Sequence, residues 1–111
     1  MKVCKMKSKS AVEIILYTKP GCHLCEGLAQ KLAAVQEQAV ELNFTITFRD
    51  ITTRDDWFQR YQYEIPVVFL SPKPLTDDDE PVASGAIALP RLSPRSSVDR
   101  VEQWLRRHCP S

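Results

Sequence analysis

The residues of this chain whose side chains and spacing are best suited to chemical reactivity are two cysteines, Cys22 and Cys25. They lie in the stretch KPGCHLCEG at positions 19–27. A Cys-x-x-Cys pair can cycle between dithiol and disulfide, can supply half of a tetrahedral zinc site, or can consist of two inert buried thiols. The elements around the pair must decide between these three interpretations.

The composition limits the classes of protein to which the chain can belong. Its 111 residues suit one domain, and 43% are hydrophobic, enough for one core. Lys plus Arg (15) nearly balances Asp plus Glu (14), so no global charge favours a nucleic-acid partner. Neither a run of ~18 apolar residues nor a secretory signal is visible. We therefore expect a soluble cytoplasmic protein with no membrane or nucleic-acid partner, where a close cysteine pair indicates redox or metal chemistry.

The segments on either side of the cysteines predict a strand and a helix. Residues 12–18, VEIILYT, are apolar and β-branched and end at Lys-Pro-Gly, which indicates a buried strand. Apolar residues then recur every three or four positions, the spacing of one helix face. They are Leu24, Leu28, Leu32, Val35, Ala39 and Leu42. The helix is expected to begin close to Cys22 and to run to about Glu41.

The middle of the chain predicts two more strands with a short helix between them. Residues 43–51 alternate apolar and polar side chains, with Phe48 on the apolar side and Arg49 on the polar side. Thr52 or Thr53 is expected to cap the short helix. The run IPVVFL, 65–70, then indicates a buried strand with proline at its start.

The last third predicts a loop, a weak strand and a helix. Residues 71–81 hold three prolines and four consecutive acids, as a solvated loop does. Residues 82–89, VASGAIAL, indicate a strand that Gly85 weakens. The final helix is expected to start at Ser93 as N-cap, with Pro94 in the first helical position, and to end near His108.

This order of elements is β-α-β-α-β-β-α. Alternating strands and helices predict an α/β fold with parallel strand pairs and helices on both faces of a four-stranded mixed sheet. The last two strands can form an antiparallel hairpin at one edge. We expect one domain over 12–108, with flexible tails at 1–11 and 109–111.

In this frame the cysteine pair lies where a strand ends and a helix begins. The helix N-terminus carries roughly half a positive charge and lowers the pKa of a thiol there from about 8.5 into the range of roughly 3.5–7.5. Lys19 adds a positive charge. Cys22 is therefore the expected nucleophile, and the more buried Cys25 the expected resolving thiol. His23 is a candidate for tuning the thiolate when protonated, or else an exposed spacer.

The motif LYTKPGCHLC, followed by an amphipathic helix and then by EIPVVFL, resembles the glutaredoxin branch of the thioredoxin fold. The resemblance covers roughly residues 12–108 and is strongest to small glutaredoxin-like proteins with a Cys-x-Leu-Cys site. It implies a thioredoxin fold and a thiol–disulfide oxidoreductase. It also implies a cis peptide bond between Ile65 and Pro66, opposite the cysteines, with the Ile65 backbone free to bind an extended substrate. No cofactor is required, and the implied partners are disulfide-containing proteins or glutathione, acting on a monomer.

Two departures from the family pattern concern glutathione. Dithiol glutaredoxins typically have Pro-Tyr between the cysteines, where this chain has His23-Leu24. They also carry a Gly-Gly-x-Asp element before the last helix. Residues 96–99, SSVD, are the counterpart by position, with Asp99 facing the glutathione amino group. A helix that starts at Ser93 would place them inside a helical turn, which leaves Lys19 as the better-supported contact for glutathione as a co-substrate.

Other interpretations of the pair stay open. A zinc site would need two more ligands from Cys4, Cys109, His23 and His108, and an iron–sulfur cluster shared between two subunits is known in parts of the family. A redox sensor without turnover is a further alternative. The arsenate-reductase and transcription-regulator branch is disfavoured, because the segment between Cys22 and Pro66 is too short for its extra helical subdomain. We assign no metal ligand.

Overall fold

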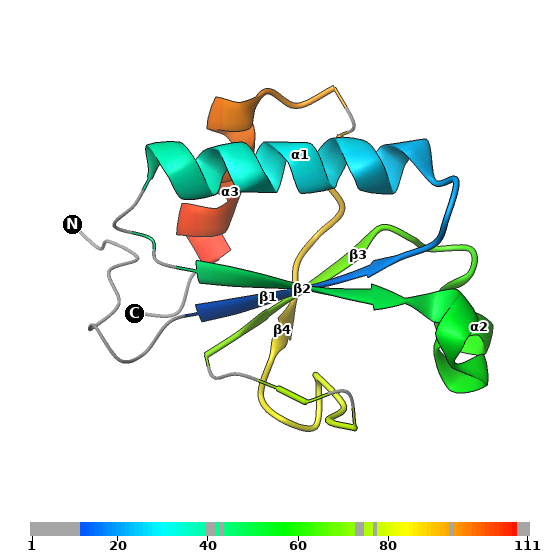
Figure 1. Ribbon diagram of the computed structural model, residues 1–111. Helices are drawn as coiled ribbons and strands as arrows, with labels where there is room; N and C mark the ends of the chain where they lie inside the picture. Colours follow the sequence, from blue (N-terminus) through cyan, green and yellow to red (C-terminus); the bar gives the residue numbers. More distant parts are fainter. Residues whose placement is uncertain are drawn as a thin grey trace.

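The computed structural model describes residues 12–39, 42, 44–72, 75–76, 78–93 and 95–108 of the chain. The tails expected at 1–11 and 109–111, with Cys4 and Cys109, lie outside these ranges. The elements follow one another in the predicted order (Figure 1). They are β1 (Val12–Thr18), α1 (His23–Gln38), β2 (Phe44–Asp50), the 3-10 turn η2 (Ile51–Thr53), α2 (Asp55–Tyr61), β3 (Val67–Ser71), β4 (Ile87–Ala88) and α3 (Val98–His108).

The strands form one four-stranded mixed sheet in the order β2-β1-β3-β4. β1 pairs in parallel with β2, and a three-residue turn connects its carboxyl end to Cys22. β3 pairs antiparallel with β1 on one side and with β4 on the other. The predicted hairpin at the edge of the sheet is thus confirmed, together with the parallel pair.

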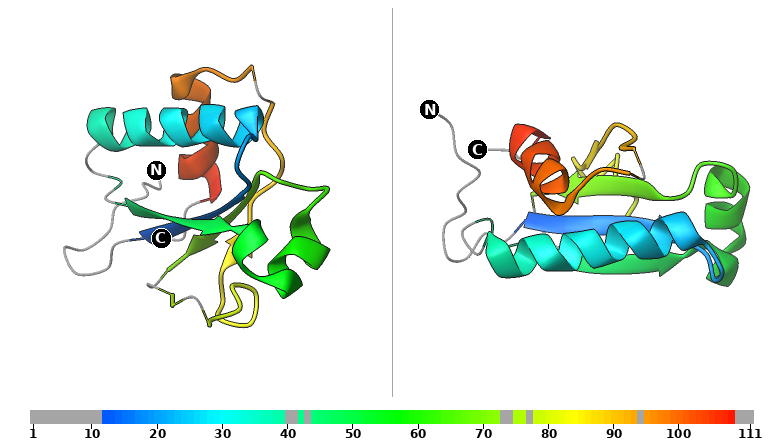
Figure 2. Two further views of the ribbon diagram at one scale, coloured as in Figure 1. Left: turned by 45° about the vertical axis from the view of Figure 1, so that its right-hand side comes forward. Right: turned by 90° about the horizontal axis from the view of Figure 1, so that it is seen from above.

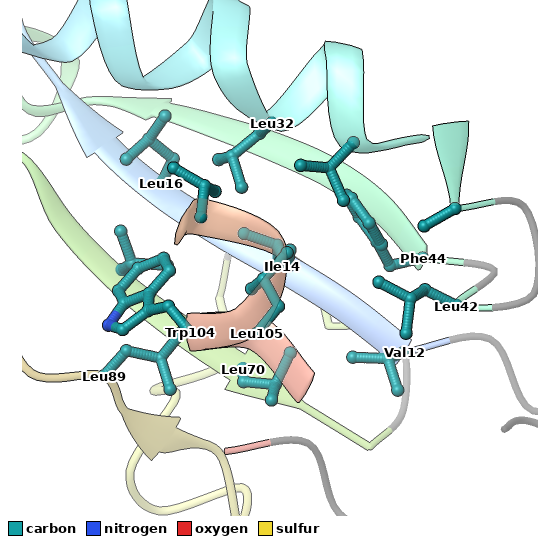
Figure 3. Close-up of a cluster of buried hydrophobic side chains, with 14 residues drawn as sticks. Val12, Ile14, Leu16, Leu32, Leu42, Phe44, Leu70, Leu89, Trp104 and Leu105 are labelled. Carbon is teal, nitrogen blue, oxygen red and sulfur yellow. The ribbon is translucent and has the colours of Figure 1, made fainter. Parts of the chain in front are cut away.

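The central strand β1 explains why residues 12–18 are apolar on both of their faces. Val12, Ile14 and Leu16 face α1 and α3, where they pack with Leu32 and Trp104 (Figure 3). The alternate side chains Ile15 and Tyr17 pack on the opposite face with Trp57 and Tyr61 of α2. Figures 1 and 2 show α1 and α3 together on one side of the sheet and α2 near the arrowhead of β2. Helices therefore cover both faces, as predicted.

The start of the last helix differs from the prediction. α3 begins at Val98, because Ser97 caps it: the Ser97 hydroxyl accepts a hydrogen bond of 3.2 Å from the Arg100 N–H. Ser93 instead forms an isolated turn, in which its hydroxyl accepts from the Arg95 N–H and its carbonyl from the Ser96 N–H. Two serines thus carry the same capping signal, and only the second is followed by helix.

Other helix and strand boundaries also differ from the prediction. α1 ends at Gln38, before the expected Glu41, which lies outside the described residues. Thr52 and Thr53 belong to η2, which Asp50 caps, and α2 begins after Arg54 without a side-chain cap. The strand expected over 82–89 shrinks to Ile87–Ala88. Residues 81–85 fold into turns held by backbone bonds to Pro81, with Gly85 at a φ of 92°.

Arg49 shows that the apolar–polar alternation of β2 does not decide which side chains are buried. Phe48 is exposed, whereas Arg49 is only 2% exposed. The Arg49 guanidinium donates to the Tyr17 hydroxyl (2.9 Å) and to the carbonyls of Thr76 (2.6 Å) and Asp79 (3.2 Å). Its carbon lies 5.1 Å from the centre of the Trp57 ring. The 71–81 segment is therefore tied to the sheet by a buried cation, rather than being a fully solvated loop.

We expect Arg49→Ala to lower the free energy of unfolding by about 2–4 kcal/mol, because it removes packing and leaves the Tyr17 hydroxyl and two carbonyls without their donor. Burial raises the pKa of Tyr17 to about 12, so the hydroxyl that loses its donor is a buried, uncharged group. Urea denaturation measures the change. The control Arg95→Ala, at an exposed site, should stay within about 0.5 kcal/mol of the parent. Equal effects of the two substitutions would contradict the anchoring role.

Candidate functional site

The cysteine pair lies at the N-terminus of α1, directly after the turn that ends β1. The Cys22 N–H donates to the Lys19 carbonyl (3.1 Å), and Gly21 adopts a φ of 83°, a region that side chains disfavour. Cys22 is the N-cap residue of α1, and its sulfur accepts a hydrogen bond of 3.1 Å from the Cys25 N–H. The sulfur thus occupies the place that a serine or aspartate oxygen takes in other helix caps.

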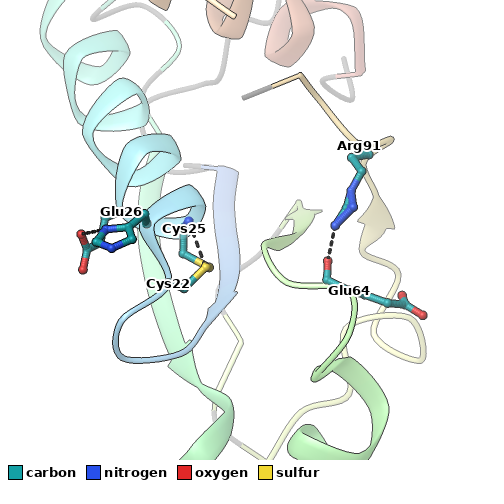
Figure 4. Close-up of a disulfide and its surroundings, with 6 residues drawn as sticks. Cys22, Cys25, Glu26, Glu64 and Arg91 are labelled. Atoms are coloured by element: carbon teal, nitrogen blue, oxygen red, sulfur yellow. Dashed lines mark hydrogen bonds and ion pairs between the residues drawn. A yellow bond between two sulfur atoms is a disulfide. The ribbon is translucent and has the colours of Figure 1, made fainter. Parts of the chain in front are cut away.

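Cys22 and Cys25 form a disulfide across the first turn of α1, with their Cα atoms 5.3 Å apart (Figure 4). This separation is within the usual range for a disulfide. Cys22 is half-buried, whereas Cys25 is 2% exposed and packs against the protein interior. A substrate can therefore approach the sulfur of Cys22 more easily than that of Cys25. The roles of nucleophile and resolving thiol stay predictions.

The Ile65–Pro66 peptide bond is cis, as the resemblance implied. The expectation of a free Ile65 backbone is wrong for its N–H, which donates to the Tyr61 carbonyl at the end of α2 (3.2 Å). No hydrogen bond within the described residues engages the Ile65 carbonyl. Ile65 and Pro66 are both half-buried, and Pro66 lines the same pocket as His23 and Leu24. The structure thus brings the proline loop and the cysteine turn together.

A pocket of about 210 Å³ adjoins the cysteine turn, and sequence reasoning did not find it. Four separate segments line it: α1, the Pro66 loop together with the β3 strand that follows it, the segment after β4, and α3. The lining residues are His23, Leu24, Gly27, Leu28, Lys31, Pro66, Val68, Leu89, Pro90, Arg91, Leu92, Ser93, Val101 and Trp104. Two contacts hold its far wall: the Trp104 indole donates to the Pro90 carbonyl (3.1 Å), and Arg91 donates to the Glu64 carbonyl (3.0 Å, Figure 4).

Comparison with protein families matches residues 13–106 to the model described as a glutaredoxin-like domain. This chain belongs to the glutaredoxin-like family. A search of curated proteins finds no match. The predicted resemblance, made from the cysteine and proline motifs, is confirmed.

Solved structures similar to this glutaredoxin-like protein confirm the thioredoxin fold. Thioredoxin-2, a component of the malaria parasite protein secretion machinery, aligns with a TM-score of 0.57 at 12% identity, covering 93% of this chain and 88% of its own. Trxlp from Edwardsiella tarda EIB202 aligns with a TM-score of 0.56 at 12% identity, covering 89% and 85%. A malarial protein aligns with a TM-score of 0.54 at 12% identity, covering 88% and 97%. At this identity the likeness concerns the fold alone.

Two further side chains of this glutaredoxin-like protein were predicted to act at the site. Lys19 is exposed in the turn before Cys22, and its side chain contacts no partner among the described residues. The His23 side chain is 93% exposed, and its Nδ1 lies 3.8 Å from Glu26, which lies on the side of α1 away from the disulfide (Figure 4). A protonated His23 would therefore pair with Glu26. This contact favours the spacer interpretation, and thiolate tuning stays a prediction.

The start of α3 at Val98 affects whether the SSVD segment could contact glutathione. Because the helix begins at Val98, the SSVD segment spans its N-terminus, with Ser97 as the cap and Asp99 in the first turn, and is not buried further along the helix as we had expected. Asp99 is exposed in the first turn, where its carboxylate accepts a hydrogen bond of 3.3 Å from the Gln38 amide. Whether this segment contacts glutathione stays a prediction.

The metal interpretation finds no support in the described part of the glutaredoxin-like domain. No group of three or more His, Cys, Asp or Glu side chains comes together there. His108 is placed far along α3, where its Nδ1 lies 2.9 Å from the Trp104 carbonyl. Within the same described ranges, no helix has the length and apolar character needed to cross a membrane.

Proposed function

We propose that this protein is a small thiol–disulfide oxidoreductase whose working couple is Cys22–Cys25. The observation that carries the proposal is a disulfide at a helix N-terminus in which one sulfur is half-exposed and the other is buried. Membership of the glutaredoxin-like family supports the same class of chemistry. An inert structural pair would have no need of this asymmetry.

The proposed reaction transfers two electrons from the protein dithiol to a substrate disulfide. The Cys22 thiolate attacks one substrate sulfur, forms a mixed disulfide and releases the first substrate thiolate, which takes up a proton. The deprotonated Cys25 sulfur then attacks the Cys22 sulfur and releases the second substrate thiolate. The product is the Cys22–Cys25 disulfide seen in the structure, and two molecules of glutathione or one dithiol protein would reduce it again.

Three features support Cys22 as the attacking thiol. Its sulfur is in the N-cap position, where unpaired N–H groups and the helix dipole stabilise negative charge. The Cys25 N–H already donates to this sulfur, and the same bond to a thiolate would be charge-assisted. Lys19 adds an exposed cation one turn before it. Together these features would stabilise a thiolate at this position.

The proposed partners are disulfide-containing proteins and glutathione, and no bound metal or organic cofactor is needed, because the two sulfurs carry the electrons. Lys19 and the segment ending at Asp99 are the proposed contacts for glutathione, with Pro66 and the Ile65 carbonyl as the docking edge for an extended substrate. Since turnover needs a supply of reducing thiols, we place the activity in a reducing compartment such as the cytoplasm, and we expect the monomer to be active.

Intact-mass spectrometry across a series of glutathione redox buffers tests the proposal. We expect a loss of two hydrogens that maps to Cys22–Cys25, with a midpoint between about −120 and −270 mV. A Cys4→Ser/Cys109→Ser variant serves as the control, because it removes the other two thiols and should titrate alike. Glutathione adducts on Cys22 would identify glutathione as a reaction partner. A pair that stays reduced throughout, or a protein purified with bound metal, would contradict the proposal.

A further inference from the structure

The pocket beside the disulfide has an apolar interior that neither the dithiol chemistry nor the helix cap requires. Buried side chains from β3 and α3, Val68, Val101 and Trp104, line its inner part. Leu24, which lies between the two cysteines in the sequence, and Pro66 line it as well. The pocket therefore extends from the side chains next to the cysteine pair to the apolar surface of the main core.

Gly27 lines this pocket and carries no side chain that could fill it. It lies within α1, two residues after Cys25, and a Cβ built on it would meet nothing within 4 Å. Its φ is not in the left-handed region, so the backbone does not require glycine. Glycine costs about 1 kcal/mol relative to alanine inside a helix. Because Gly27 has no side chain, the wall of the pocket next to the cysteine turn has free space.

The size and charge of the pocket indicate what it can hold. About 210 Å³ is below the roughly 300–1,000 Å³ of small-molecule sites, and suits one leucine- or phenylalanine-sized side chain. Among the described residues that line it, Lys31 and Arg91 are cationic and none is acidic. An apolar side chain with a carboxylate beside it would complement such a site.

We propose that this pocket is a specificity subsite for polypeptide disulfides. It takes a large apolar side chain next to the substrate cysteine that reacts with Cys22, with a neighbouring carboxylate facing Lys31 and Arg91. The inference rests on the proposed oxidoreductase function and names its substrate class. In glutathione a γ-glutamyl group and a glycine flank the cysteine, so glutathione disulfide leaves the subsite empty. A protein or peptide disulfide is then the preferred oxidised substrate, and glutathione at most the reductant.

Reduction of short peptide disulfides tests the subsite. The probes are the disulfide dimers of acetyl-Phe-Cys-Asp amide and acetyl-Gly-Cys-Asp amide, and a second pair with Asp-Cys-Phe and Asp-Cys-Gly covers the opposite chain direction. We expect kcat/KM to be about tenfold higher for the Phe peptide in at least one pair, because one buried apolar group supports discrimination of that order. Phe-Cys-Lys should react more slowly than Phe-Cys-Asp.

Gly27→Leu should fill the pocket and bring the Phe-to-Gly ratio from about ten to about one. Ala33→Leu is the matched control, because it adds the same side chain on α1 at an exposed position outside the pocket and should keep the ratio. Thermal unfolding verifies that both variants fold. Equal rates for the Phe and Gly peptides in the parent protein, or an unchanged ratio in Gly27→Leu, would overturn the subsite.

A binding measurement separates failure of the subsite from failure of the proposed function. Acetyl-Phe-Ser-Asp amide cannot react, yet it should shift the indole N–H resonance of Trp104 in an NMR titration. The Trp57 indole, in the cluster on the other face of the sheet, is the internal control. A Trp104 shift without reduction of any disulfide would refute the oxidoreductase and keep the pocket. Disulfide reduction with no preference for the Phe peptide and no Trp104 shift would refute the subsite and keep the oxidoreductase. If neither disulfide reduction nor a Trp104 shift were found, both proposals would be refuted.

Discussion

Cys22→Ser is expected to lower the rate of disulfide reduction by at least about 10³-fold, because a hydroxyl is not ionised near pH 7 and cannot replace a thiolate nucleophile. The rate is measured with a peptide disulfide and the pre-reduced protein. Cys4→Ser and Cys109→Ser are the controls and should retain the parent rate. A Cys22→Ser protein that reduced the peptide at the parent rate would show that the nucleophile is wrongly assigned.

The structure also predicts that this loss will not result from unfolding. Cys22 caps α1 by accepting a hydrogen bond from the Cys25 N–H, and serine is among the best N-cap residues. The serine hydroxyl can therefore accept the same bond. We expect the thermal midpoint of Cys22→Ser to stay close to that of the reduced parent protein, which separates loss of the nucleophile from loss of the helix.

Cys25→Ser is expected to stop the reaction at the mixed disulfide. The first attack needs only Cys22, whereas release of the second substrate thiol needs a sulfur that can reach Cys22 from within the first helical turn. Mixing the reduced variant with excess peptide disulfide should give a near-stoichiometric adduct of one peptide on Cys22, measured by intact mass and peptide mapping.

Cys22→Ser provides the matched control for this trapping experiment, because its remaining Cys25 thiol is buried and should not form the adduct. Addition of a dithiol should release the peptide from Cys25→Ser and regenerate the free protein. If the peptide were found on Cys25 in the Cys22→Ser protein at a comparable rate, the burial of Cys25 would not control the order of attack, and the two roles would have to be exchanged.

Several parts of this protein could be predicted from the sequence because their signals are local. The largely apolar run of 12–18 indicated a buried strand, and the structure places β1 in the interior of the sheet, between β2 and β3. The Lys-Pro-Gly turn and the three-and-four spacing that follows it located Cys22 at the junction with α1. The element order, the mixed sheet and the glutaredoxin-like resemblance followed from such patterns, each of which extends over fewer than about twenty residues.

Local capping signals were less decisive where the same signal occurred twice. Ser93 followed by proline predicted a helix start, yet the hydroxyl of Ser93 closes a turn and Ser97 caps α3. Val101, Trp104 and Leu105 of α3 pack in the main core, and the Trp104 indole donates to the carbonyl of Pro90 in the segment before the helix. A local capping signal contains no information on such long-range contacts, so it could not decide between the two serines.

Contacts between distant segments decided what the sequence alone could not. Arg49 is buried because carbonyls at positions 76 and 79 and the ring of Trp57 come to it, although its own strand pattern predicted a solvent-facing side chain. The Ile65 N–H is engaged because the end of α2 turns back to it. The pocket beside Cys22 exists only where α1, the Pro66 loop, the segment after β4 and α3 converge. From local patterns we could predict that Cys22 and Cys25 are the reactive pair and on which elements they lie. The shape and charge of the surface beside them could not be predicted in this way, because that surface is assembled from segments up to about eighty residues apart.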